Sequence, residues 1–214
     1  LQGNIPQDQK FVPGTGVAQA LAWYPQQMRE GLAAAASANG PQLVVAPETA
    51  LPLLPEQLGP DFWRGLFGPL AEQNASQPAA LLTGLPLGNL EAGYTNSAWG
   101  VSPEAARSAL ASGQPTQVHR YDKHHLVPFG EFVPPFFRWF TQMMNIPLGD
   151  FARGALPQPS WAWAGQRIAP NICYEDLFGE EIAASFRDVD AAPTVLVNLS
   201  NIAWFGDTVA IDQH

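Results

Sequence analysis

Three side chains of this sequence have the types that acyl transfer through a cysteine requires: Cys173, Glu48 and Lys123. A thiolate attacks a carbonyl carbon and forms a thioester, and a base must first take the proton from the thiol. Glu48 is a candidate for that general base. Lys123, together with the backbone N–H of Tyr174, is a candidate to stabilise the oxyanion. If the three side chains converge, the sequence predicts a covalent acyl intermediate.

Cys173 is the only cysteine of the chain, so it has no partner for an internal disulfide. It lies in the segment 170–176, between an apolar run and Leu177-Phe178-Gly179, which predicts a strand turning into a helix with the thiol at the bend. Helix N-termini and nearby cations stabilise a thiolate, and a thiol activated in this way reacts with iodoacetamide without the usual dependence on ionisation near pH ~8.5. The alternative is a buried free cysteine that serves as a small hydrophobic side chain.

Each of the three candidates follows a segment that has the pattern of a strand. Glu48 comes after the apolar run 43–46, Lys123 after 117–122, and Cys173 after 167–172. Loops at the carboxyl ends of strands are where α/β folds place their chemistry. Taken singly, Glu48 has an ordinary alternative as a carboxylate at a helix entry, and Lys123 as a surface cation.

Apolar and β-branched runs of strand length alternate with helical segments along the chain, which indicates an α/β layered fold. Strands are predicted at 43–46, 80–84, 94–101, 117–122, 167–172 and 194–199. Helices are predicted at 18–38, 62–73 and 180–186. Pro25 should break the first helix or mark its beginning.

Composition narrows the possible functions of the 214 residues. The net charge of −9 argues against a nucleic-acid partner, which would require a basic face. Charged residues make up only 14%, well below the ~25% of typical soluble domains. No run of about 18 uninterrupted apolar residues and no signal peptide is found, so the sequence itself predicts no membrane span. The chain stops just after an apparent loop, and we expect it to be part of a longer protein.

Several blocks of the sequence resemble a known family. Pro47-Glu48, the block 123–131 (KHHLVPFGE) and the block 172–175 (ICYE) are similar to the Glu-Lys-Cys signatures of the nitrilase superfamily. The blocks 1–7 (LQGNIPQ), 121–134 (YDKHHLVPFGEFVP) and 198–206 (NLSNIAWFG) resemble the apolipoprotein N-acyltransferase family more closely. The resemblance covers essentially the whole chain. One departure is Ile202, where that family has an aspartate.

The resemblance implies a nitrilase-like αββα sandwich, incomplete at the C-terminal end because the family's domain continues past His214. It implies that residues 1–214 form the carbon-nitrogen hydrolase (nitrilase-like) catalytic domain of a longer membrane protein. That domain would face the periplasm at the bacterial inner membrane. Contact with the membrane would come through segments absent from this chain.

The resemblance also implies a reaction and its partners. The family moves an acyl chain from a phospholipid donor to the N-terminal S-diacylglyceryl cysteine of an apolipoprotein acceptor, through a cysteine thioester in two half-reactions. By the same resemblance, Glu48 is the base, Lys123 the oxyanion-binding lysine and Cys173 the nucleophile. Glu131 is a second acidic residue near the lysine, and Glu175 is one near the nucleophile. No cofactor is expected.

The segment 132–148 is unusually aromatic and apolar. It is either a helix packed on the core or, as a functional hypothesis, a mobile lid that contacts the bilayer and guides acyl chains toward Cys173. Phe137 and Trp139 in this segment, and Trp204 beyond it, are therefore candidate substrate-binding residues.

Two other functions compete with acyl transfer. A soluble amidase or nitrilase-type hydrolase would use the same three residues with water as the acceptor. A non-catalytic lipid-binding or lipoprotein-binding domain would retain a degenerate site.

His124 and His125, with Glu131, do not predict a metal site, because adjacent side chains of an extended segment point to opposite faces.

Overall fold

The computed structural model describes residues 1–3, 16–35, 42–73, 78–89, 91, 93–115, 117–128, 131–132 and 151–201. The candidates Phe137, Trp139 and Trp204 lie outside the described residues, as do Ile202 and all of the segment 132–148 except Phe132. Among the helices that are described, none has the length and apolar character needed to cross a membrane.

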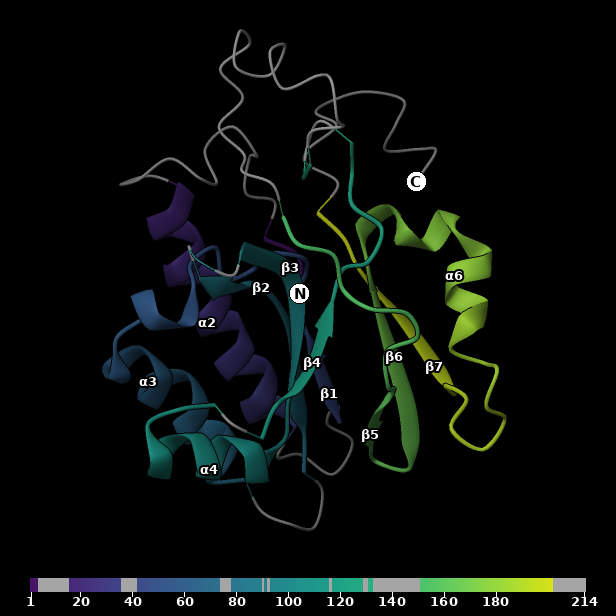
Figure 1. Ribbon diagram of the computed structural model, residues 1–214. Helices are drawn as coiled ribbons and strands as arrows, with labels where there is room; N and C mark the ends of the chain where they lie inside the picture. Colours follow the sequence, from purple (N-terminus) through teal and green to yellow (C-terminus); the bar gives the residue numbers. More distant parts are fainter. Residues whose placement is uncertain are drawn as a thin grey trace, which may run out of the picture.

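Two β-sheets lie face to face in the fold (Figure 1). The first has the order β1-β2-β3-β4 and consists of β1 (Leu43–Val45), β2 (Ala80–Asn89), β3 (Gly93–Val101) and β4 (His119–Asp122). The second has the order β5-β6-β7 and consists of β5 (Trp161–Trp163), β6 (Gln166–Ile172) and β7 (Val195–Leu199). β1 pairs with β2 and β6 with β7 in parallel, and the other pairs are antiparallel.

Helices cover the outer sides of the two sheets. Figure 1 shows α2 (Gly16–Ala34), α3 (Pro60–Ala71) and α4 (Pro103–Ser112) beside the first sheet. The short α6 (Gly179–Ala184) lies beside the second sheet. The layers therefore run helix, sheet, sheet, helix, which confirms the predicted α/β sandwich.

The outer core lies between the helices and the first sheet. Buried side chains of α2 and α3, such as Met28 and Phe67, pack with Leu81 and Leu85 of β2. The helix α2 continues through Pro25, so the predicted break there is wrong. Pro25 is itself buried, and packing of its helix on this core outweighs the backbone hydrogen bond that a proline removes.

The helix α4 was not predicted, although its sequence carries the usual end signals. The side chain of Ser102 accepts a hydrogen bond from the Ala105 N–H (3.1 Å), Pro103 takes the first position, and Gly113 ends the helix with φ 74°. The three-residue strand β5 was also missed, because it is too short to show alternation.

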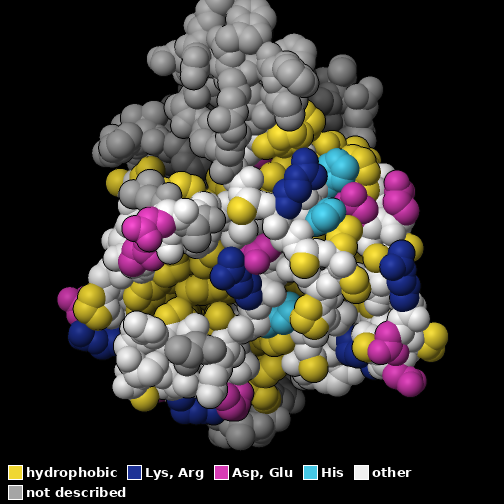
Figure 2. Space-filling model, in the orientation of Figure 1, with side chains coloured by type: hydrophobic (Ala, Val, Ile, Leu, Met, Phe, Trp, Pro, Cys, Tyr) yellow, Lys and Arg dark blue, Asp and Glu magenta, His cyan; other side chains and the backbone are white. Residues whose placement is uncertain are grey.

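The inner core lies between the two sheets and includes the nucleophile candidate. Leu82, Ala98 and other residues of the first sheet pack with Ile168, Ile172 and neighbours from the second, and Cys173 belongs to the same cluster. Charged side chains are few and scattered over the face drawn in Figure 2, in keeping with their low share of the sequence.

Two glycine-to-alanine substitutions should have opposite effects on stability. A Cβ on Gly100 of β3 would lie 2.6 Å from the ring of Trp161 on the opposite sheet, so Gly100→Ala should lower the free energy of unfolding by about 1–3 kcal/mol. Gly65 lies within α3 with nothing near its Cβ position, so Gly65→Ala should raise it by up to about 1 kcal/mol. Urea unfolding of both variants checks this, and equal effects would contradict the described packing between the sheets.

Candidate active site

Glu48, Lys123 and Cys173 each follow the carboxyl end of a strand, and the fold brings those ends together. Glu48 lies beyond β1, Lys123 directly after β4, and Cys173 directly after β6. All three are buried, with exposed fractions of 3%, 0% and 5%. The charges of Glu48 and Lys123 both act on the thiol of Cys173. The three candidates therefore share one buried site.

Lys123 lies between two carboxylates. Its Nζ is 2.9 Å from Oε2 of Glu131 and 3.5 Å from Oε1 of Glu48. Burial alone would lower the pKa of Lys123, but the two carboxylates outweigh burial and raise it. The lysine is therefore charged. This agrees with the expectation that a carboxylate at position 131 lies beside it.

Asn96 on β3 is a member of this cluster that was not predicted. Its Nδ2 donates hydrogen bonds to Oε1 of Glu48 and Oε1 of Glu131, both at 2.7 Å. Its backbone oxygen accepts from the N–H of Lys123 at 2.8 Å. The only signal in the sequence is a run of three polar residues, Thr95, Asn96 and Ser97, inside a strand that is apolar at its C-terminal end.

The loop that carries Glu48 depends on a close backbone approach at Gly84 of β2. A Cβ on Gly84 would lie 2.6 Å from the Pro47 oxygen and 2.7 Å from Cα of Glu48, so no side chain fits there without moving the loop. Thr49 has φ 47°, a backbone conformation that is strained for a residue other than glycine. Gly84 was not predicted as a positioning residue, because the contact is visible only when β2 and the loop are side by side.

Cys173 occupies a strained turn. Its φ is 55°, and it begins the short 3₁₀ helix η2 (Cys173–Leu177) directly after β6, which confirms the predicted strand turning into a helix. Asn198 of β7 stabilises this conformation, because its Nδ2 donates to the Cys173 oxygen at 2.7 Å and to Oδ1 of Asn171 at 2.5 Å. Asn198 is a second positioning residue that sequence reasoning missed.

Glu175 links the nucleophile turn to the chain around Lys123. Its Oε2 accepts from the Ile172 N–H (2.6 Å) and the Tyr121 hydroxyl (2.9 Å). Its Oε1 accepts from the N–H groups of His124 (2.7 Å) and His125 (3.1 Å). Burial raises the pKa of Glu175, while these donors oppose the rise. Because all four partners donate, the carboxylate serves here as an acceptor only.

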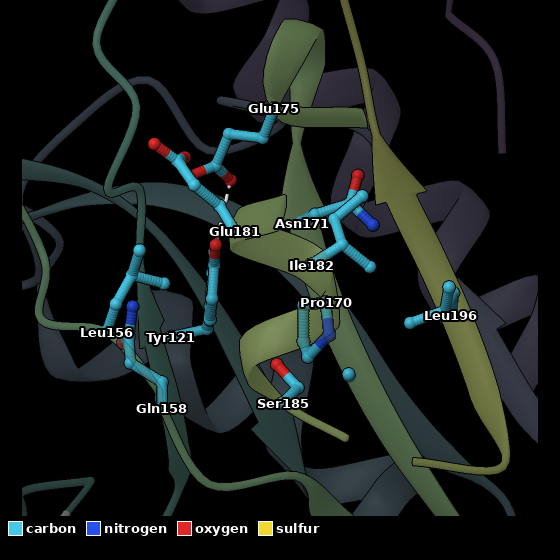
Figure 3. A pocket seen from close by; sticks show the side chains of 11 residues that line it. Tyr121, Leu156, Gln158, Pro170, Asn171, Glu175, Glu181, Ile182, Ser185 and Leu196 are labelled. Carbon is cyan, nitrogen blue, oxygen red and sulfur yellow. Dashed lines mark hydrogen bonds between the residues drawn. The ribbon is translucent and has the colours of Figure 1, made fainter. Parts of the chain in front are cut away.

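A pocket lies behind the nucleophile turn, and Cys173 and Lys123 are not among its lining residues. Figure 3 shows Tyr121 pointing toward Glu175 in this pocket, with their hydrogen bond drawn. Gln158, also in its wall, donates to the Asp122 oxygen and accepts from the Asp122 N–H. These polar side chains of the pocket wall are therefore hydrogen-bonded within the protein. The bond from Tyr121 to Glu175 joins β4 to the turn that carries the nucleophile.

The thiol of Cys173 is neutral at rest. Burial, and then the negative charge of Glu48, raise its pKa to about 11. Lys123, the Ser200 hydroxyl and the N–H of Tyr174 act in the opposite direction and do not reverse the shift. Burial, which the sequence did not reveal, therefore keeps the proton on sulfur until a base removes it.

The two histidines make separate contacts. Nδ1 of His124 lies 2.7 Å from the Gly154 oxygen, and Nδ1 of His125 lies 2.9 Å from Oε1 of Glu181. His125 also stacks on the ring of Phe178. Within the described ranges, no group of three or more His, Cys, Asp or Glu side chains has an arrangement that could hold a metal ion.

Charge substitutions beside Cys173 should shift its ionisation in opposite directions. In the parent protein the thiol should titrate with a midpoint of about 11. Glu48→Gln should lower the midpoint because it removes a negative charge, and Lys123→Met should raise it because it removes a positive one. Thiolate absorbance, corrected with Cys173→Ala for tyrosine ionisation, measures this. Shifts in the same direction for both variants would contradict the described geometry.

Gly84→Ala should displace Glu48 without removing any charged group. A new Cβ would contact the backbone of Pro47 and Glu48, and misplacement of a catalytic group by about 1 Å costs roughly 100-fold in rate. Gly59→Ala is the matched control, since nothing lies within 4 Å of its Cβ position. The rate of Cys173 alkylation by iodoacetamide measures both variants, and equal rates would show that Gly84 does not position the loop.

The chain is homologous over its full length to curated proteins of one name, although no family model matches it. It is 60% identical over 214 residues to the apolipoprotein N-acyltransferase of Verminephrobacter eiseniae (strain EF01-2). It is 49% identical over 214 residues to that of Ralstonia nicotianae (strain ATCC BAA-1114 / GMI1000). Each match covers 100% of this chain and 36% of the relative, so the chain spans about a third of the length of these proteins.

Solved structures show the same fold at low sequence identity. A CN-hydrolase superfamily protein from Xanthomonas campestris, with an arsenic adduct in its active site, has a TM-score of 0.53 at 19% identity, over 86% of this chain and 59% of that one. A mutant amidase from Nesterenkonia sp. AN1, with an acetamide moiety added covalently to its active-site cysteine, has a TM-score of 0.52 at 17% identity, over 89% and 64%. Over its whole length, this chain is therefore homologous to about a third of the apolipoprotein N-acyltransferases. It has the fold of the nitrilase, or CN-hydrolase, superfamily.

Proposed function

We propose that this chain is the catalytic domain of an apolipoprotein N-acyltransferase. It would transfer a fatty acyl chain from a phospholipid to the α-amino group of the N-terminal S-diacylglyceryl cysteine of an apolipoprotein. The observation that carries the proposal is the buried set of Glu48, Lys123 and Cys173, in a chain that is homologous to these enzymes along its whole length. As in the family it resembles, the domain would face the periplasm at the inner membrane.

In the first half-reaction, Glu48 removes the proton of the Cys173 thiol as sulfur attacks the ester carbonyl of the phospholipid. The high pKa of the thiol requires such a base, since little thiolate exists before the substrate binds. A carbon–sulfur bond forms, and the carbonyl oxygen becomes an oxyanion that the charged Lys123 stabilises. When the ester carbon–oxygen bond breaks, Glu48 returns its proton to the leaving alkoxide, and a lysophospholipid departs.

In the second half-reaction, the neutral α-amino group of the apolipoprotein attacks the thioester. Lys123 again stabilises the oxyanion, and Glu48 accepts a proton from the attacking nitrogen. The carbon–sulfur bond then breaks, the amide is released, and the proton passes from Glu48 to the Cys173 sulfur. Both the base and the nucleophile return to their starting states.

The charge distribution of the cluster supports this division of roles. Glu48 and Glu131 both raise the pKa of Lys123 and keep it positive, and Glu131 makes the closer contact with Nζ, at 2.9 Å against 3.5 Å for Glu48. Glu48 is therefore the carboxylate better suited to exchange a proton. An amidase would use the same groups with water as acceptor, and the homology favours transfer to an amine instead.

The acyl-enzyme can be detected by intact mass spectrometry of the full-length protein in membranes, after exposure to phospholipid without acceptor. We expect a mass gain of one acyl chain that hydroxylamine removes, because hydroxylamine cleaves thioesters. The gain should be absent in Cys173→Ala and strongly reduced in Glu48→Gln.

A well-folded protein that forms no adduct would contradict the proposal. Hydrolysis of small amides by that protein would then favour the amidase, and loss of both activities would favour a non-catalytic lipid-binding domain.

A further inference from the structure

Asn96 has two polar ends in unlike surroundings. Its Nδ2 donates to Glu48 and Glu131, whereas its Oδ1 is buried with no hydrogen-bond partner among the described residues. The side chain as a whole is only 3% exposed. A buried acceptor without a partner destabilises a fold, so stability alone would favour an apolar residue at this position. The amide is better explained by what its donor end does.

The orientation of the amide is determined by its neighbours. If the side chain were turned round, Oδ1 would lie 2.7 Å from two carboxylate oxygens, which repel it. The N–H end therefore faces the carboxylates, and it supplements Lys123, the one positive side chain of the cluster. The backbone oxygen of Asn96 also holds the N–H of Lys123 at 2.8 Å, so a single residue is in contact with all three charged groups.

We propose that Asn96 is a positioning residue that orients the carboxylate of Glu48 to accept the proton of Cys173. The inference rests on the proposed role of Glu48 as the base. Besides Asn96, the groups around Glu48 include Lys123 from the end of β4, Glu131, Cys173 from η2, and the N–H of Asn201 at 3.2 Å from Oε2. Without the amide, Oε1 of Glu48 loses its donor at 2.7 Å and keeps the longer contact with Nζ of Lys123 at 3.5 Å, so the carboxylate is held less firmly.

The test is the pH dependence of Cys173 alkylation by iodoacetamide in the full-length protein. Alkylation of a neutral thiol needs a base, so the rate should fall at low pH, where the base can no longer accept the proton of the thiol. In Asn96→Ala this acid limb should move to higher pH by about one unit, because a hydrogen bond to a charged group is lost. Asn96→Asp, which has the same shape but adds a third carboxylate, should move the limb further.

Ser97→Ala is the matched control. Ser97 neighbours Asn96 on β3, is fully buried, and bonds Asp122 Oδ1 at 2.6 Å and Thr95 Oγ1 at 2.7 Å, with no contact to the carboxylate cluster. Ser97→Ala should reduce stability and leave the acid limb where it is. An unmoved limb in folded Asn96→Ala or Asn96→Asp would overturn the proposal, as would an equal shift in Ser97→Ala.

Acyl transfer, measured in parallel, separates this inference from the proposed function. If the parent forms no acyl-thioester but the acid limb still shifts, the role of Asn96 stands and the acyltransferase proposal fails. If the parent forms the thioester and the limb does not shift, the role of Asn96 fails. In an active enzyme, Asn96→Ala should lower kcat and leave KM for phospholipid unchanged, and a rise in KM alone would overturn the positioning role.

Discussion

The burial of Lys123 between Glu48 and Glu131 is the constraint on which the rest of the site depends. A buried lysine without partners would lose its proton or destabilise the fold, and two carboxylates near one another would repel. Together the three groups, with the Asn96 amide, form a cluster that tolerates burial. Its members come from the loop after β1, from β3, from the end of β4 and from the segment beyond it, so the first sheet must be assembled before the cluster exists.

The nucleophile belongs to the second sheet, and Glu175 connects the two sheets at this point. Its carboxylate accepts from Ile172 at the end of β6 and from His124 and His125, which follow Lys123. Asn198 holds the strained Cys173 turn from the neighbouring strand. The thiol and the lysine are thus positioned by hydrogen bonds within the fold.

Sequence patterns were sufficient to predict the strands that carry the site and to select the candidate residues at their ends. The apolar run before Glu48 and the strand before Cys173 correspond to β1 and β6, because buried strands leave a strong local signal. Asn96 and Gly84 left no such signal. Asn96 acts on a carboxylate 48 positions away in the chain, and the importance of Gly84 comes from the backbone of another segment.

The same difference explains why the break predicted at Pro25 is wrong and why the protonation state of Cys173 was not predicted. Propensity at Pro25 was overridden by packing of α2 on the core, and the protonation of Cys173 is set by burial and by the charge of Glu48. Neither quantity can be obtained from neighbouring residues in the sequence. The family resemblance pointed to the charged side chains. The neutral groups beside them, such as Asn96 and Gly84, became visible only in the folded structure.

In the proposed mechanism, one thiol relays an acyl chain from a phospholipid to an amine under the control of a buried charge cluster. The most direct test starts from the acyl-enzyme, freed of donor, and adds a diacylglyceryl lipopeptide with either a free or an acetylated α-amino group. We expect the free amine to remove the acyl group from Cys173 and to yield N-acylated peptide in equal amount. The acetylated peptide should leave the thioester intact. Discharge to free fatty acid at the same rate with both peptides would contradict it and would indicate a hydrolase.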